Sequence, residues 1–176
     1  MLFKAIYRGK TLFNNFTGYE FYYNILQNND PDDGTALGIF LNKPKVLKDL
    51  HVGNRSFNAL LDNNYLVLSR IVDDFLRSVK DIMAVIMNNY KVLLYSGNLD
   101  IAIAPVFNNQ FLNKLKWKHS EDYLRAERKI WKIGNNGMVA GYVKSIYEFH
   151  EVIIRNSGHT VPQHNLSIAF KMIKNL

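Results

Sequence analysis

The sequence predicts an α/β fold, and three observations carry this prediction. Residues 91–95 form a continuous apolar run, which is typical of a parallel strand buried on both faces. Residues 152–154 form a second apolar strand, and a glycine-containing loop follows each of the two runs. After about residue 70 the patterns read helix, buried strand, helices, hairpin, buried strand and helix, which is an alternation expected of α/β domains.

The helices are indicated by apolar spacing and by their flanking residues. A short helix is expected over residues 44–50, because Pro44 fits the first turn, where its missing N–H costs nothing. Apolar residues from Val72 to Ile86 recur at helical spacing, and Asn88 and Asn89 end that helix. Two shorter helices are expected over residues 109–115 and 120–129.

A hairpin and a final helix complete the pattern. Asn136 and Gly137 separate two β-like runs, residues 130–133 and 138–143, and this dipeptide is a strong hairpin signal. The last helix is expected to bury a face made of Leu166, Ala169, Phe170 and Ile173.

Composition excludes several classes of function. The chain has 176 residues, 48% of them apolar, which suits a globular domain, and no apolar run approaches the roughly 20 residues that cross a bilayer. No membrane partner is therefore expected. The absence of cysteine excludes disulfides, thiolate metal sites and a cysteine nucleophile.

The net charge of +7 raises the question of nucleic-acid binding. The basic excess lies largely between Lys114 and Lys132, where acidic residues are interspersed. Pairs such as Glu121 and Arg125, four residues apart, indicate a solvated helix rather than a recognition surface. We therefore predict no nucleic-acid partner.

Two ionisable residues follow the two predicted buried strands, which is where α/β proteins place functional loops. Asp100 follows residues 91–95, and His159 follows residues 152–154. An Asp that orients a His is the supporting half of a Ser-His-Asp triad. The spacing alone also permits two solvated loop residues. A metal site on His159 and His164 lacks a third ligand at suitable spacing, so no metal and no cofactor is predicted.

Two motifs, one around Asp100 and one around His159, resemble those of a known protein family. YKVLLYSGNLD at residues 90–100 and NSGHTVP at residues 156–162 resemble the Asp and His motifs of the serine carboxypeptidases, in particular the vitellogenic-like branch. The similarity continues through shorter segments and covers nearly the whole chain; these segments are residues 50–54, 86–90, 129–132 and 140–143.

This resemblance implies the C-terminal part of an α/β-hydrolase fold with part of a helical cap insertion. Residues 1–70 then correspond to a partial cap, and residues 71–176 to the C-terminal segment of the hydrolase core. The resemblance also assigns roles: Asp100 orients, and His159 is the general base and acid in release of C-terminal amino acids from peptides. Thr160 stands where relatives often carry an apolar residue that lines the pocket for the leaving amino acid.

The chain departs from the family in one major respect, because no Gly-x-Ser-x-Gly nucleophile motif occurs in it. It resembles about the last two-fifths of such an enzyme, so we expect it to be inactive alone and to pair with the serine-bearing N-terminal part of the same enzyme. The alternative is a non-catalytic fragment or interaction protein with a remnant hydrolase fold.

The resemblance further implies a secreted or a lysosomal or vacuolar protein, although the chain shows no signal peptide. Asn15 and Asn54 lie in glycosylation sequons within the cap-like part, and we expect them to be the first sites modified. Asn165 lies in a third sequon, close to His159.

Overall fold

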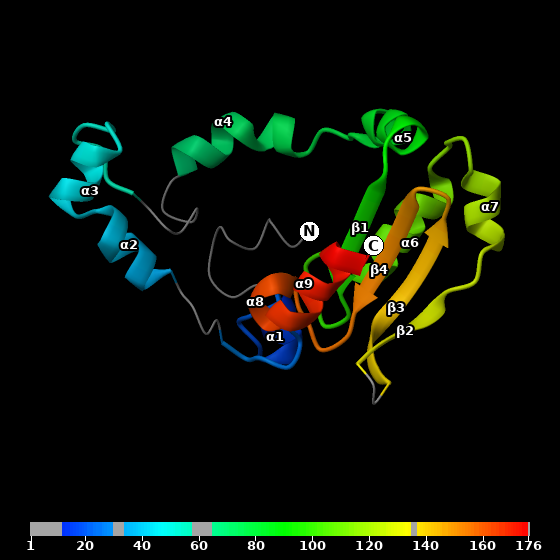
Figure 1. The fold of residues 1–176 in the computed structure, drawn as a ribbon. Helices are drawn as coiled ribbons and strands as arrows, with labels where there is room; N and C mark the ends of the chain where they lie inside the picture. The colour runs from blue at the N-terminus through cyan, green and yellow to red at the C-terminus, as the bar shows by residue number, and fades with distance from the viewer. Residues whose placement is uncertain (1–11, 30–33, 58–64, 135–136, 176) are drawn as a thin grey trace. The chain divides into compact units, whose positions relative to one another are not determined.

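The computed structural model divides the chain into two compact units (Figure 1). The first comprises residues 1–20 and 29–77, and the second comprises residues 21–28 and 78–176. The residues that the structure describes are 12–29, 34–57, 65–134 and 137–175. The assignment of residues 1–70 to a cap stays a prediction, and its residues 1–11, 30–33 and 58–64 lie outside the described ranges.

The first unit contains short helices, which are α1 (Leu12–Thr17), α2 (Thr35–Leu41), α3 (Pro44–Asp49) and α4 (Tyr65–Phe75). The helix predicted from Pro44 is confirmed as α3, with proline in its first turn. Asn42 ends α2, and its side chain forms two hydrogen bonds with the backbone of Phe57. Its side-chain amide nitrogen donates to the Phe57 carbonyl at 2.8 Å, and its amide oxygen accepts from the Phe57 N–H at 2.7 Å.

The single helix predicted across Val72 to Ile86 is wrong. The chain instead forms α4, which ends at Phe75, and α5 (Lys80–Asn89). Between them, the Ser78 hydroxyl oxygen lies 3.4 Å from the Lys80 N–H, and a serine hydroxyl that accepts from the backbone competes with a continuing helix. Apolar spacing continues across the break, so periodicity could not locate it.

The second unit is built on a four-stranded sheet in the order β1-β4-β3-β2. Its strands are β1 (Val92–Gly97), β2 (Lys129–Ile133), β3 (Met138–Ile146) and β4 (Phe149–Ile154). β1 pairs with β4 in parallel, as the two apolar runs predicted. The expected burial of residues 91–95 on both faces is wrong, because β1 is the edge strand of the described sheet and most of its residues are only half-buried. β2 and β3 pair antiparallel, which confirms the hairpin, although Asn136 itself lies outside the described residues.

Helices cover both faces of this sheet (Figure 1). On one face lie α8 (Val161–His164) and α9 (Leu166–Asn175), and on the other lie α5, α6 (Pro105–Lys114) and α7 (Ser120–Arg125). Successive residues of β4 alternate between the two: Phe149 packs with α6 and α7, and Val152 packs with α8 and α9. The α/β architecture is therefore confirmed.

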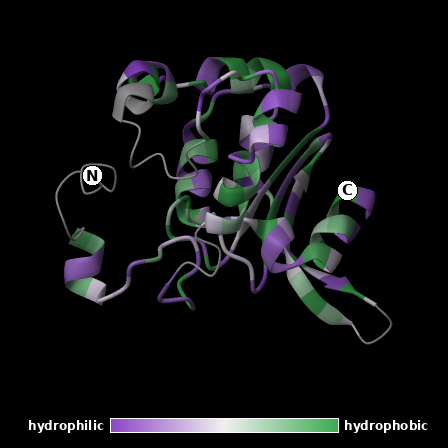
Figure 2. Cartoon of the chain, turned by 90° about the vertical axis from the view of Figure 1, so that its left-hand side faces the viewer, coloured by the Kyte–Doolittle hydropathy of each residue, from purple (hydrophilic) through white to green (hydrophobic). Residues whose placement is uncertain are grey.

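The buried face of the last helix differs from the predicted one. Ala169 is buried as expected, but its buried companions are Ile168 and Met172. Leu166, Phe170 and Ile173, expected on that face, are instead 72%, 65% and 70% exposed. Figure 2 shows hydrophobic and hydrophilic stretches along this helix, next to the label C. Because apolar residues lie on more than one side, periodicity could not decide which side packs on the sheet.

The other helix predictions need smaller corrections. The helix expected over residues 109–115 begins earlier, at Pro105. The one expected over residues 120–129 ends at Arg125, and the chain then extends toward β2. Among the described residues, no helix is long and apolar enough to cross a membrane.

Candidate active site

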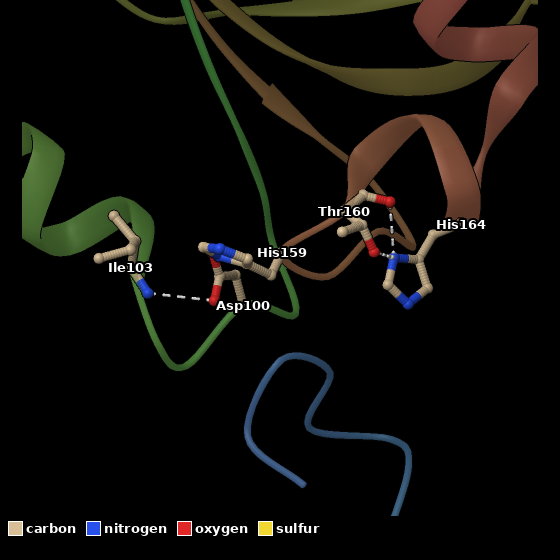
Figure 3. A network of polar contacts seen from close by, with 5 residues as sticks. All are labelled: Asp100, Ile103, His159, Thr160 and His164. Carbon is tan, nitrogen blue, oxygen red and sulfur yellow. Dashed lines mark hydrogen bonds and ion pairs between the residues drawn. The ribbon is translucent and has the colours of Figure 1, made fainter. Parts of the chain in front are cut away.

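Asp100 and His159 come together at the carboxyl ends of β1 and β4. Each follows its strand by a short loop, and because the strands are parallel neighbours, both loops rise at the same edge of the sheet. The His159 Nδ1 lies 2.9 Å from the Asp100 Oδ2, although 59 positions separate the two residues (Figure 3). The contact predicted between these two side chains is therefore confirmed.

The Asp100 carboxylate is almost fully enclosed, since only 4% of its side chain is exposed. A buried carboxylate needs hydrogen-bond donors. One oxygen accepts from His159, and the other accepts from the backbone N–H of Ile103 at 3.1 Å (Figure 3). Both oxygens are thereby engaged, which fixes the carboxylate in one orientation.

The imidazole of His159 is oriented by this carboxylate. An ionised carboxylate only accepts, so the Nδ1 must carry the proton, and the lone pair of a neutral imidazole is then on Nε2. The Nε2 has no hydrogen-bond partner among the described residues, and 37% of the side chain is exposed. The His159 imidazole is therefore a base that is partly exposed, and the Asp100 carboxylate that orients it is buried.

The two loops are held together by their backbones. The Asn98 N–H donates to the Ile154 carbonyl, and the Leu99 N–H donates to the Ser157 carbonyl, both at 2.9 Å. At the end of β1, Gly97 lies so close to the second loop that an added Cβ would be 2.1 Å from the Ser157 carbonyl oxygen. Glycine is thus required for the approach that aligns Asp100 with His159.

A third segment, residues 21–28, is bonded to both loops, and sequence reasoning missed it. The Ile25 N–H donates to the Leu99 carbonyl at 3.0 Å, and the His159 N–H donates to the Tyr23 carbonyl at 2.7 Å. No local pattern signals this contact, because the segment lies more than 70 residues before Asp100 in the chain. The Ile103 N–H was missed as well, although an Asp just after a strand is a common acceptor for a turn.

Thr160 is exposed and immediately follows His159 in the chain. His164, on the same short helix α8, donates from Nδ1 to the Thr160 carbonyl oxygen at 2.9 Å, with the Thr160 hydroxyl at 3.4 Å (Figure 3). The His164 side chain therefore bonds back to the residue at the start of its own helix, α8. In the described part of the chain, no group of three His, Asp or Glu side chains could hold a metal ion.

A buried charged group lies on β4, the strand that leads to His159. Glu151 is 3% exposed, accepts a hydrogen bond from the Tyr123 hydroxyl at 2.9 Å, and forms an ion pair with Arg128 at 2.5 Å. Burial, followed by the charge and hydrogen bond of Glu151, raises the pKa of Tyr123. The Lys144 ammonium lies 3.9 Å above the Tyr123 ring, and burial lowers the pKa of Lys144. These residues anchor β4 against α7.

The two predicted glycosylation residues lie in the first unit. Asn15 is on α1, Asn54 follows α3, and both are exposed. The structure gives their accessibility, and their modification stays a prediction.

A family model described as serine carboxypeptidase matches residues 4–176. Among curated relatives, the probable serine carboxypeptidase CPVL of Homo sapiens is 41% identical over 92% of this chain and 33% of its own length. The venom serine carboxypeptidase of Apis mellifera is 37% identical over 86% of this chain and 32% of its own length. The vitellogenic carboxypeptidase of Aedes aegypti is 34% identical over 98% of this chain and 36% of its own length. The chain thus spans about a third of these relatives.

A solved structure supports the same fold. A prohormone-processing carboxypeptidase from Saccharomyces cerevisiae is similar with a TM-score of 0.61 and 18% identity, over 86% of this chain and 35% of that one. The α/β-hydrolase fold predicted for the chain is therefore shown.

Proposed function

Because the chain belongs to the serine carboxypeptidase family, we propose that Asp100 and His159 supply the acid–base half of a Ser-Asp-His triad. The observation that carries the proposal is the hydrogen bond of 2.9 Å between the buried Asp100 carboxylate and the His159 imidazole, whose side chain is 37% exposed. This is the arrangement by which Asp holds His in the tautomer that accepts a proton from serine. The reaction is release of C-terminal amino acids from peptides.

The proposed chemistry has two proton transfers at His159. During attack, the serine oxygen bonds to the scissile carbonyl carbon, and its proton moves to the His159 Nε2. The same proton then moves to the nitrogen of the leaving amino acid as the peptide bond breaks. A water repeats the sequence to release the acyl group. Asp100 stays ionised and stabilises the imidazolium in both steps.

The serine comes from a second part in this proposal. The chain spans about a third of its relatives and contains no Gly-x-Ser-x-Gly motif. β1 forms one edge of the described sheet and leads directly to Asp100. Both faces of a parallel sheet are normally covered by helices, and an exposed edge strand promotes aggregation because its backbone N–H and C=O groups are unpaired. We therefore assign this edge to the serine-bearing N-terminal part of the same enzyme, with the chain inactive alone.

We also propose that Thr160 lines the pocket for the leaving amino acid, and its exposed position directly after His159 supports this role. A secreted or a lysosomal or vacuolar location is part of this proposal, and the name of the venom relative supports secretion.

The test is hydrolysis of a blocked peptide, followed by detection of the released C-terminal amino acid. We expect no turnover by the chain alone and turnover after co-expression with the serine-bearing part. His159→Gln should lower kcat by roughly 10⁴-fold or more, and Asp100→Asn by about 10⁴-fold. His150→Gln is the matched control, because His150 is bonded to Ser145 within the β3–β4 hairpin. Equal activity of the His159 and His150 variants would refute the proposal.

A further inference from the structure

We propose that Tyr23 is a positioning residue for His159, holding the imidazole in the plane from which its Nε2 can reach the serine. This inference rests on the proposed function and adds a residue to it. It is carried by a ring contact and by a set of backbone bonds, all within the second unit.

The Tyr23 ring stacks on the imidazole of His159. The ring centroids are 4.8 Å apart, and the planes differ by only 17°. The same residue also holds the His159 backbone, since the Tyr23 carbonyl accepts the His159 N–H at 2.7 Å. Tyr23 thus restrains His159 at two points, one on the main chain and one on the ring.

The stacked ring supplies a restraint that Asp100 cannot. A single hydrogen bond at Nδ1 fixes one atom of the imidazole but leaves the ring free to tilt about that contact. Tilting would move the Nε2, at the far side of the ring, away from the serine. A flat partner against the imidazole face opposes the tilt, and because it contacts the face, it leaves the Nε2 free to exchange a proton.

Tyr23 is itself held in place by neighbouring aromatic rings. The Phe21 and Tyr22 rings both meet it edge-on, with centroids 5.5 Å and 4.9 Å away. Phe21 is 8% exposed and therefore anchors the segment in the unit.

The backbone of the segment is bonded to the Asp100 loop on both sides of that residue. The Ile25 N–H donates to the Leu99 carbonyl at 3.0 Å, and the Ile101 N–H donates to the Tyr22 carbonyl at 3.2 Å. Residues 21–28 therefore connect the Asp100 loop to the His159 loop.

The close approach of Tyr23 depends on the residue before His159. A Cβ added to Gly158 would lie 2.1 Å from the Tyr23 carbonyl oxygen and 2.9 Å from the Asn24 Cβ. Any other residue at this position would push the segment away from the loop. The glycine of the His motif thus serves the contact with residues 21–28.

An aromatic face also suits the charge that develops in the reaction. When His159 takes the serine proton it becomes an imidazolium, and cations are attracted to the π face of a neighbouring ring. Stacking therefore remains favourable through both proton transfers. Tyrosine contributes through its ring, so its hydroxyl is dispensable for this role.

The experiment compares Tyr23→Phe, which keeps a flat ring, with Tyr23→Leu and Tyr23→Met, which fill the space without one. Tyr90→Leu is the control, because Tyr90 is 68% exposed and lies just before β1. In the assembled enzyme we expect the Leu and Met variants to lower kcat by on the order of 10- to 100-fold with little change in KM. Tyr23→Phe and Tyr90→Leu should stay within about twofold of the parent.

Nuclear magnetic resonance of the 176-residue chain gives an independent readout. The downfield Nδ1 proton of His159 should persist in the parent and in Tyr23→Phe, and should broaden or vanish in Tyr23→Leu and Tyr23→Met. Asp100→Asn should remove it in every background. If Leu and Met retain both the signal and kcat, or if Phe is as impaired as Leu, the inference is overturned. A signal that depends on Tyr23 in an assembled enzyme without peptidase activity would overturn the proposed function alone.

Discussion

Substitution of Gly97 by alanine tests the close approach that aligns the Asp100 and His159 loops. The added Cβ would lie 2.1 Å from the Ser157 carbonyl oxygen, 2.3 Å from the Gly158 carbonyl oxygen and 2.5 Å from the Ser157 carbonyl carbon. All three are backbone atoms, so no side chain can rotate away. The second loop must therefore move by about an ångström or more to restore ordinary contact distances.

The cost has two parts. Overpacking of this kind typically lowers the free energy of unfolding by about 1–3 kcal/mol. The displaced Ser157 carbonyl also accepts the Leu99 N–H at 2.9 Å, and loss of that hydrogen bond costs about 1 kcal/mol more. We therefore expect Gly97→Ala to lower the free energy of unfolding by about 3 kcal/mol.

Equilibrium unfolding in urea, followed by the fluorescence of Trp117 and Trp131, measures this change, on the chain alone or on its complex with the serine-bearing part. Asn98→Ala is the matched control, because its exposed side chain neighbours Gly97 while its backbone contacts are unchanged. Gly97→Ala should also separate Asp100 from His159 and lower kcat. A loss no larger than that of the control would refute the argument that glycine is required here.

Three further predictions concern other parts of the molecule. The raised pKa of Tyr123 means that its contribution to stability is complete below its ordinary value of about 10 and is lost as the pH rises further. Unfolding followed from pH 8 to 11 should show that decline, and Tyr123→Phe should lack it while losing about 1–3 kcal/mol at pH 7 through the lost hydrogen bond to the Glu151 carboxylate, which keeps its ion pair with Arg128. The Ser157 hydroxyl is buried without a hydrogen-bond partner among the described residues, so Ser157→Ala should leave the Tm unchanged or higher, and a loss above about 1 kcal/mol would contradict this. Peptide mapping of secreted material should find glycan at Asn15 or Asn54, whereas occupancy of the third sequon alone would speak against that placement.

The sequence predicted the parts of the site that follow from local patterns. Asp100 and His159 were placed at one sheet edge because continuous apolar runs identify buried strands, and parallel strands bring their carboxyl ends together. The hairpin was predicted because Asn-Gly favours one turn geometry. In each case the decisive information lies within about ten residues of the chain.

The features that the sequence did not predict depend on contacts between distant segments. The stacking of Tyr23 on His159 joins positions 136 residues apart, and no spacing rule connects them. The buried face of α9 was misassigned because Phe170 and Ile168 are both apolar and only packing distinguishes them. The break before α5 lies where the Ser78 hydroxyl is 3.4 Å from the Lys80 N–H, and the apolar spacing on either side continues across it.

The central claim is that this chain activates a serine carried by another part of the enzyme. The most direct measurement is labelling of the serine-bearing part by a fluorophosphonate probe, with and without this chain. We expect that labelling requires the chain and is abolished by His159→Gln, that His150→Gln has no effect, and that no serine of the chain itself is labelled. Labelling that is unaffected by His159→Gln, or stoichiometric labelling of a serine within the chain, would contradict it.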